Sequence, residues 1–331
     1  MQSSSLSHRA RLETCLSGQQ PDRAPVALWR HFPVDDQTPG GLAAATAYFQ
    51  NTYDFDLIKV TPTSSFCIKD WGVEDRWAGN PEGTRDYTRR AIQHPEDWVK
   101  LKPIDPTQGF LGEQLACLRL LTHEFAGRVP VIQTIFSPMA QAKNLVGPDE
   151  LLVHMRRNPD ALQDGLARIT ETTIRFLQEA KKTGIDGVFY AVQHAQYRLV
   201  SLDEFTAFCR KYDLQVLEAA RDLWLNMLHL HGDAVMFDAV LDYPAAIINW
   251  HDRETQPDLN AALARFPGAV CGGLRQWDTM VLGTPDQVRA EAMDAIQQTG
   301  GRRFILGTGC VLPTTAPYGN ILAARQSVEA R

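Results

Sequence analysis

Short apolar runs alternate with longer amphipathic stretches along the whole chain. Each run is rich in Val, Ile, Leu or Phe, which is typical of a strand buried on both faces. Eight runs follow this pattern: Val26–Arg30, Asp56–Val60, Val131–Ile135, Gly187–Val192, Asn226–His231, Ala246–Trp250, Ala269–Gly273 and Arg303–Gly307. The alternation predicts a parallel sheet built from βα units.

The amphipathic stretches carry helix start and stop signals. Asn158-Pro159-Asp160 begins a long stretch that runs to Lys182, and Thr183-Gly184 ends it. Similar signals predict three further helices, which begin near Gly147-Pro148, Ser201 and Thr284-Pro285.

Two segments depart from the alternation. Residues 1–24 predict an N-terminal extension with one short helix. Thr63–Gly109 is a long excursion after the second strand, with Gly, Pro and Trp scattered through it. Because a loop of this length in a compact domain is usually functional, we expect the excursion to overhang the mouth of the fold.

Eight strands in a repeated βα pattern predict a single (β/α)8 TIM barrel over residues 1–331, whose active site would lie at the carboxyl ends of the strands. A doubly wound open sheet is the alternative. No G-x-G-x-x-G follows the first strand, so nothing indicates a dinucleotide-binding fold.

The composition limits the classes of partner that we expect. The formal net charge is −6, which makes nucleic acid an unexpected partner because such binding needs clustered Lys and Arg. No apolar run approaches the roughly 20 residues that cross a bilayer, and Met1–Gln20 is polar, so we expect a cytoplasmic protein without membrane contact. The six cysteines are scattered, which predicts reduced thiols.

The fifth strand ends in His229-Leu230-His231, and the eighth is followed by Gly309-Cys310. Successive strand side chains alternate faces, so both histidines lie on one face. If that face is the barrel interior, two imidazoles and a thiol meet at the mouth. Two nitrogens and a thiolate with an open fourth position match a catalytic zinc site.

Other polar residues at the predicted strand ends complete a pocket. We predict substrate binding by six of them: Arg30, His31, Lys59, Gln193, Trp250 and Arg275. Arg30 and Arg275 could clamp a carboxylate or phosphate between them. His194 and His251 are the candidate proton donors, since histidine titrates near neutral pH.

The C-terminal third carries the most specific motifs, Gly283–Val288, Leu306–Pro313 and Ala316–Asn320. Together with the eight-strand pattern, they resemble the uroporphyrinogen decarboxylase superfamily, which also contains zinc-dependent corrinoid and coenzyme M methyltransferases. The resemblance extends from Ala24-Pro25-Val26 to Ala323. It implies a TIM barrel and a homodimer.

The decarboxylase residues of this superfamily are missing. Decarboxylases carry an Asp after the second strand, a Tyr after the third and a His after the eighth, where this chain has Thr63, Asn144 and Thr308. They also carry paired arginines after the first strand, where only Arg30 is present, followed by His31.

The chain resembles the methyltransferase branch of the superfamily more than the decarboxylase branch. Its members bind zinc through a His-x-Cys after the fifth strand and a Gly-Cys after the eighth. This chain has His229 and Cys310 at two of these places and His231 in place of the first Cys. A neutral imidazole instead of a thiolate makes the site one charge unit more positive, so an oxygen substrate becomes an alternative to a thiol acceptor.

Three functions stay open. The first is a zinc-dependent methyltransferase that moves a methyl group from a small-molecule donor, or from a corrinoid that is free or carried by a partner protein, to a metal-bound acceptor. The second is a metal-free decarboxylase or lyase that uses Arg30 and Arg275 on a tetrapyrrole or small carboxylic acid. The third is a non-catalytic module that binds a corrinoid or tetrapyrrole.

Overall fold

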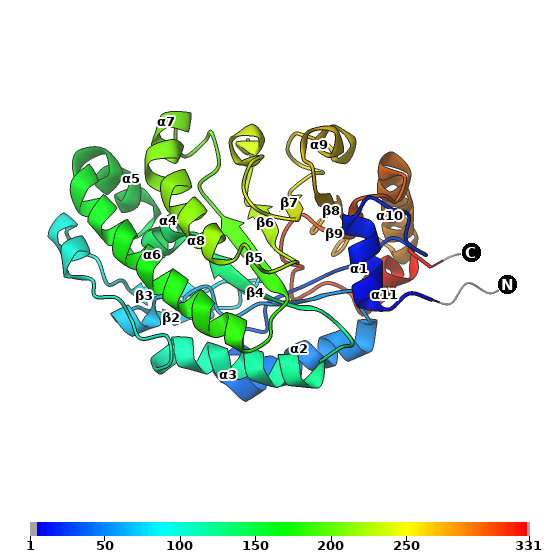
Figure 1. Ribbon diagram of the computed structural model, residues 1–331, viewed down its shortest axis with the longest axis horizontal. Coiled ribbons are helices and arrows are strands. Elements are labelled where there is room, and N and C mark those ends of the chain that lie inside the picture. Colours follow the sequence, from blue (N-terminus) through cyan, green and yellow to red (C-terminus); the bar gives the residue numbers. More distant parts are fainter. Residues whose placement is uncertain (1–4, 330–331) are drawn as a thin grey trace.

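A parallel sheet of seven strands forms the centre of the computed structural model, which describes residues 5–329. The strand order is β1-β4-β5-β6-β7-β8-β9, and the sheet curls around its own interior (Figure 1). The strands are β1 (Ile58–Val60), β4 (Val131–Phe136), β5 (Gly187–Val192), β6 (Met227–Leu230), β7 (Ile247–Trp250), β8 (Ala269–Leu274) and β9 (Phe304–Thr308). Every residue of these strands is buried, as the apolar runs predict.

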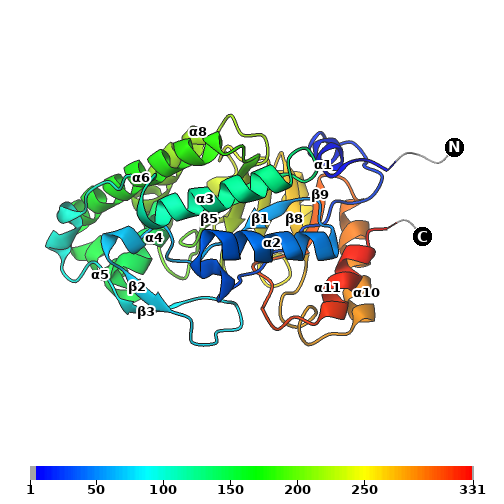
Figure 2. The same cartoon turned by 90° about the horizontal axis from the view of Figure 1, so that it is seen from below.

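Helices cover the outside of the sheet (Figures 1 and 2). They are α1 (His8–Leu16), α2 (Pro39–Tyr53), α3 (Gly109–Glu124), α4 (Pro138–Val146), α5 (Pro148–Arg157), α6 (Pro159–Lys182), α7 (Leu202–Phe205), α8 (Lys211–Ala219), α9 (Leu259–Arg265), α10 (Pro285–Thr299) and α11 (Tyr318–Gln326). A π-helical turn at Thr206–Arg210 joins α7 to α8. The start and stop signals are confirmed for α6, which spans the predicted stretch, and for α10, which is one residue longer than predicted. Among residues 5–329, no helix is long and apolar enough to cross a membrane.

The predicted first strand, Val26–Arg30, is not a strand. It forms a single parallel bridge between Val26 and Leu306 of β9, and the amide of Ala27 donates to the Leu306 carbonyl at 2.9 Å. On its other side, the Val26 amide donates to the carboxylate of Asp56 at 2.8 Å instead of to a strand carbonyl. Because a side chain takes the place of a ladder partner, regular pairing stops, and the eight-strand prediction is confirmed for seven strands.

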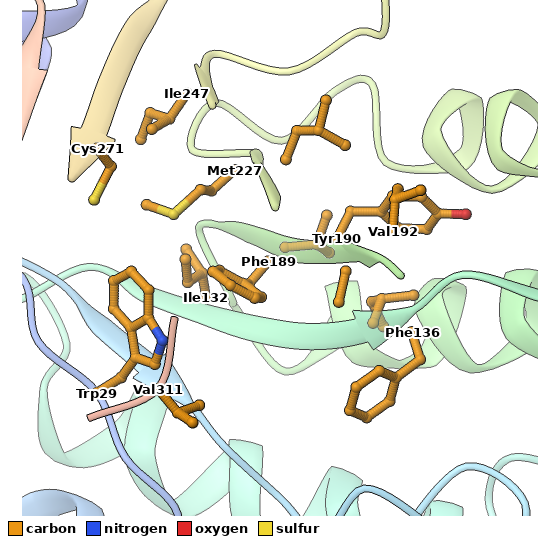
Figure 3. Packing of buried hydrophobic residues seen from close by; sticks show 14 of the residues in the cluster. Trp29, Ile132, Phe136, Phe189, Tyr190, Val192, Met227, Ile247, Cys271 and Val311 are labelled. Atoms are coloured by element: carbon orange, nitrogen blue, oxygen red, sulfur yellow. The ribbon is translucent and has the colours of Figure 1, made fainter. Parts of the chain in front are cut away.

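Alternating strand residues fill the interior of the sheet. Figure 3 shows Ile132, Phe189 and Met227 from neighbouring strands gathered opposite Trp29. Trp29 packs edge-on against Phe189 with ring centroids 5.3 Å apart. These side chains form an apolar layer one step below the polar ends of the strands.

The excursion Thr63–Gly109 follows β1 and has structure of its own. It contains a 3-10 turn at Lys69–Trp71, an antiparallel hairpin of β2 (Glu74–Arg76) and β3 (Asp86–Arg89), and a second 3-10 segment at Pro95–Lys100. The hairpin lies beside α4 and α5 (Figure 2).

The tip of this hairpin is fastened to loops that follow β8 and β9. The Thr314 amide donates to the Pro81 carbonyl at 2.6 Å. The side chains of Gln276 and Trp277 donate to Glu82 at 2.9 and 3.2 Å. The excursion therefore covers the carboxyl ends of the strands, as its length predicts.

Candidate metal centre

His229, His231 and Cys310 meet at the carboxyl end of the sheet. His229 lies in β6, His231 directly after it, and Cys310 in the turn after β9. The Cys310 Sγ lies 3.8 Å from His229 Nε2 and 3.6 Å from His231 Nδ1. Within residues 5–329, this is the one set of three His, Cys, Asp or Glu side chains whose ligand atoms all lie within 4.8 Å of one another.

These separations fit a zinc ion. Zinc–sulfur bonds of about 2.3 Å and zinc–nitrogen bonds of about 2.0–2.1 Å at tetrahedral angles place sulfur and nitrogen about 3.6 Å apart. The two measured S···N distances are 3.6 and 3.8 Å. Three protein donors leave a fourth position, which is the pattern of catalytic rather than structural zinc.

Burial sets the protonation of the three side chains. It holds the pKa of His229 well below its usual range, with a further contribution from His231, and burial together with His251 lowers the pKa of His231 to about 4. Both imidazoles are therefore neutral at pH 7 and offer a lone pair. Burial raises the pKa of the Cys310 thiol to about 11, so this side chain is a thiol until a cation binds it.

A cavity extends from the three residues toward the excursion. Its walls, whose area is mostly apolar, combine six apolar residues with eight polar or charged residues. Besides the three candidate ligands, they comprise Trp29, His31, Lys59, Thr61, Pro62, Ser64, Glu82, Thr84, Thr134, Phe136, Phe189, Ala191, Gln193 and Val311. A cavity whose wall area is mostly apolar, with polar groups placed along it, is typical of a small-molecule site.

Three of the predicted substrate-binding residues line this cavity: His31, Lys59 and Gln193. The Lys59 amine lies 4.4 Å from the centre of the Phe189 ring and donates to Thr61 at 3.3 Å. Burial lowers the pKa of Lys59 to about 7. Burial, with the charge of Lys59, also lowers the pKa of His31 to about 3, so His31 is neutral.

The other three predicted substrate-binding residues do not line the cavity. The Arg30 guanidinium packs over the rings of Phe32 and Phe49, on the side of α2. Trp250 is fully buried and donates to the Pro257 carbonyl at 2.9 Å.

Arg275 is an ion-pair partner of Glu291 on α10. It shares no cavity wall with Arg30. The predicted clamp of two arginines is therefore not brought together.

The two candidate proton donors lie near the three candidate metal ligands but outside the cavity lining. The His251 ring centroid is 5.5 Å from that of His231 and 6.3 Å from that of His229. Its Nε2 is buried and has no hydrogen-bond partner among residues 5–329. His194 is buried, and burial, with Lys143 and His231 next, lowers its pKa to about 3.

Sequence reasoning missed several residues of the site. Asn249 of β7 accepts a hydrogen bond from His229 Nδ1 at 2.7 Å and is fully buried. A polar residue inside a run such as AIINW is the signal that could have identified it, because a buried amide needs partners. Glu82 and Thr84 of the excursion carry no comparable signal, since the fold of that segment brings them to the cavity.

These features define a class: an α/β protein with a curled parallel sheet and a candidate metal site of two imidazoles and one thiol at the carboxyl ends of the strands. A family model described as Uroporphyrinogen decarboxylase (URO-D) matches residues 7–331. The chain belongs to this family.

Two curated relatives are methyltransferases, which confirms the predicted branch. The methylcobamide:CoM methyltransferase MtbA of Methanosarcina mazei is 21% identical over 246 residues, covering 74% of this chain and 71% of that protein. The protein of the same name from Methanosarcina acetivorans is 20% identical over 246 residues, with the same coverage.

Solved structures show the same fold. A methyltransferase from Methanosarcina mazei superposes with a TM-score of 0.85 at 17% identity, covering 97% of this chain and 98% of that one. A B12-independent methionine synthase from Shewanella sp. W3-18-1, in complex with selenomethionine, gives a TM-score of 0.58 at 12% identity and covers 93% of this chain and 92% of that one.

Proposed function

We propose that this protein is a zinc-dependent methyltransferase that transfers a methyl group from a corrinoid, or from another small donor, to an acceptor bound at the open position of the metal centre. The observation that supports this proposal most strongly is that His229 Nε2, His231 Nδ1 and Cys310 Sγ lie at separations that fit zinc. Zinc bound there supplies Lewis acidity, which lowers the pKa of a thiol or hydroxyl acceptor.

The residues of the cavity take distinct parts in this proposal. The apolar walls made by Trp29, Phe136 and Phe189 exclude water from the reacting methyl group. Lys59 and Gln193 hold the polar part of the acceptor. His251 lies beside the three ligands with a ring nitrogen that has no partner among residues 5–329, and it takes up the proton that the acceptor loses.

The decarboxylase alternative has less support. It needs arginines that hold substrate carboxylates, and neither Arg30 nor Arg275 lines the cavity. Thr63 faces Ser65 at 3.2 Å and Thr308 donates to the Cys310 carbonyl at 2.6 Å, so neither brings a titratable group to the place where the decarboxylases carry one.

Metal analysis and methyl transfer test the proposal together. We expect about one zinc per chain in the wild type and its loss in His231→Ala and Cys310→Ala. His154→Ala and Cys117→Ala are matched controls, since both residues are buried and lie outside the cavity. With methylcobalamin and 2-mercaptoethanol, the wild type should demethylate the corrinoid, and the two ligand variants should not.

The outcomes separate the parts of the proposal. A wild type without zinc overturns the metal centre. Zinc without methyl transfer to any thiol or alcohol overturns the methyltransferase. Binding of a porphyrinogen by metal-free protein with release of CO2 supports the decarboxylase, and tight corrinoid binding without turnover, unchanged in His229→Ala, supports the non-catalytic module.

A further inference from the structure

The amide of Asn249 has only one orientation that its neighbours allow. Its Nδ2 lies 2.9 Å from the carbonyl of Cys271 in β8 and 3.0 Å from the carbonyl of Thr308 in β9. Carbonyl oxygens only accept hydrogen bonds, so both amide hydrogens must point at them. The Asn249 Oδ1 then faces His229 Nδ1 at 2.7 Å as an acceptor.

This orientation decides which nitrogen of His229 carries the proton. An amide oxygen cannot donate, so Nδ1 must hold the hydrogen of the 2.7 Å bond. With that hydrogen on Nδ1, the neutral form of the ring has its lone pair on Nε2. That lone pair belongs to the atom 3.8 Å from Cys310 Sγ.

The same amide also reaches β9, the strand that leads into the turn bearing Cys310. It donates to the Thr308 carbonyl, and the Thr308 hydroxyl donates to the Cys310 carbonyl at 2.6 Å. Asn249 and His229 are register partners on adjacent strands, with Cys271 the partner of Asn249 on the other side. One buried side chain thus connects β6, β8 and β9.

We propose that Asn249 is a positioning residue: it fixes His229 as the Nδ1–H tautomer and ties that ring to the turn bearing Cys310, so that two of the three donor atoms are arranged before any metal binds. The consequence for metal affinity rests on the proposed function. The tautomer itself is a property of the protein without metal.

Histidine NMR of metal-free protein tests the tautomer directly. In wild type with ¹⁵N-labelled histidine, two-bond correlation spectra should show a protonated Nδ1 and an unprotonated Nε2 for His229. Asn249→Leu should shift these signals toward a mixture of tautomers. Asn249→Asp loses both donors to the Cys271 and Thr308 carbonyls but keeps an acceptor oxygen for Nδ1, so it should retain the protonated Nδ1. A wild-type ring protonated on Nε2, or a pattern that Asn249→Leu leaves unchanged, overturns the proposal.

Zinc affinity, measured by competition with a chelator, tests the consequence. We expect Asn249→Leu to weaken zinc binding about 10- to 100-fold. Asn320→Leu is the matched control, because Asn320 is equally buried and also donates to two carbonyls, those of Met280 and Gly283, away from the metal centre. Equal losses in both variants, or no loss in Asn249→Leu, overturn the positioning role.

The tests distinguish a failure of the proposed function from a failure of the proposed role of Asn249. If wild type binds no zinc, the proposed function is overturned, and the NMR of the wild type still decides the tautomer. If Asn249→Leu does not fold, the wild-type and Asn249→Asp spectra decide it.

Discussion

Lys59 is a buried amine whose pKa burial lowers from 10.5 to about 7. The unfolded chain keeps this proton up to about pH 10.5, so between pH 7 and 10.5 the unfolded state binds more protons than the folded one. The contribution of Lys59 to the free energy of unfolding therefore rises with pH across that window, and its full cost is present below pH 7.

Lys59→Met should remove this cost. We expect the variant to be more stable than wild type at pH 7 by on the order of 3 kcal/mol, with a smaller difference at pH 9.5. Urea unfolding at both pH values measures it, with the exposed Lys100→Met as control. An equal difference at the two pH values would contradict the lowered pKa, and unchanged acceptor affinity would contradict a role for Lys59 in binding.

Sequence alone predicted three candidate metal ligands that the fold brings together, because the signal for two of them is local. His229 and His231 lie two positions apart in a strand, and alternation puts both on one face whatever the rest of the chain does. Asn249 and Trp250 show the limit of this reasoning. The same alternation applies to them, but register decides which one faces inward, and Asn249 is the one paired with His229.

At the scale of elements, the excursion depends on a close approach that only glycine permits. Gly83 has φ +78°, and a Cβ there would lie 2.3 Å from the Cβ of His31 on the cavity wall. Gly79, in the same segment, has φ +88°, and a Cβ there would meet no atom of residues 5–329 within 4 Å. Comparing alanine substitutions at the two glycines therefore distinguishes the cost of backbone strain from the cost of a steric clash with His31.

Gly83→Ala should therefore cost more than Gly79→Ala. The backbone penalty of about 1–2 kcal/mol is common to both, and only Gly83→Ala must also displace His31. We expect faster hydrogen exchange across residues 77–90 and a raised KM for the acceptor in Gly83→Ala alone. If the two variants behave alike, His31 is not held by the hairpin tip.

The sequence predicts the elements that have a periodic hydrophobic pattern. It does not predict where a strand is interrupted by a hydrogen bond from its backbone to a distant side chain. The α6 helix has both an amphipathic stripe and end signals, and its bounds follow from them. The segment Val26–Arg30 has the apolar pattern of a strand, but the carboxylate of Asp56 binds the Val26 amide. A tertiary contact of that kind leaves no trace in the local pattern.

At the scale of the whole molecule, Asp56 joins the N-terminal extension to the sheet. Its carboxylate is fully buried and accepts hydrogen bonds from Arg11, Arg23 and His8, besides the Val26 amide. Burial alone would raise its pKa, but the bond from His8 and the charges of Arg23 and Arg11 lower it to about 2. The stabilisation is thus present above about pH 4 and is lost as the pH falls through 2.

Asp56→Asn should destabilise the protein by about 3 kcal/mol at pH 7, because the buried Arg23 loses its close charge partner and Arg11 keeps only Asp22. Thermal or urea unfolding measures the loss, and the difference from wild type should shrink toward pH 2. Asp54→Asn is the control, since that carboxylate is 60% exposed. A loss below about 1 kcal/mol would mean that the extension is held by other contacts.

X-ray absorption at the zinc edge of the purified protein tests the central claim most directly. The account predicts one sulfur at about 2.3 Å and two imidazole nitrogens at about 2.0–2.1 Å, with one further light ligand at the open position. Cys310→Ser should remove the sulfur signal and leave the nitrogens. A shell with no sulfur, with more than one sulfur, or unchanged in Cys310→Ser would contradict a metal centre of His229, His231 and Cys310.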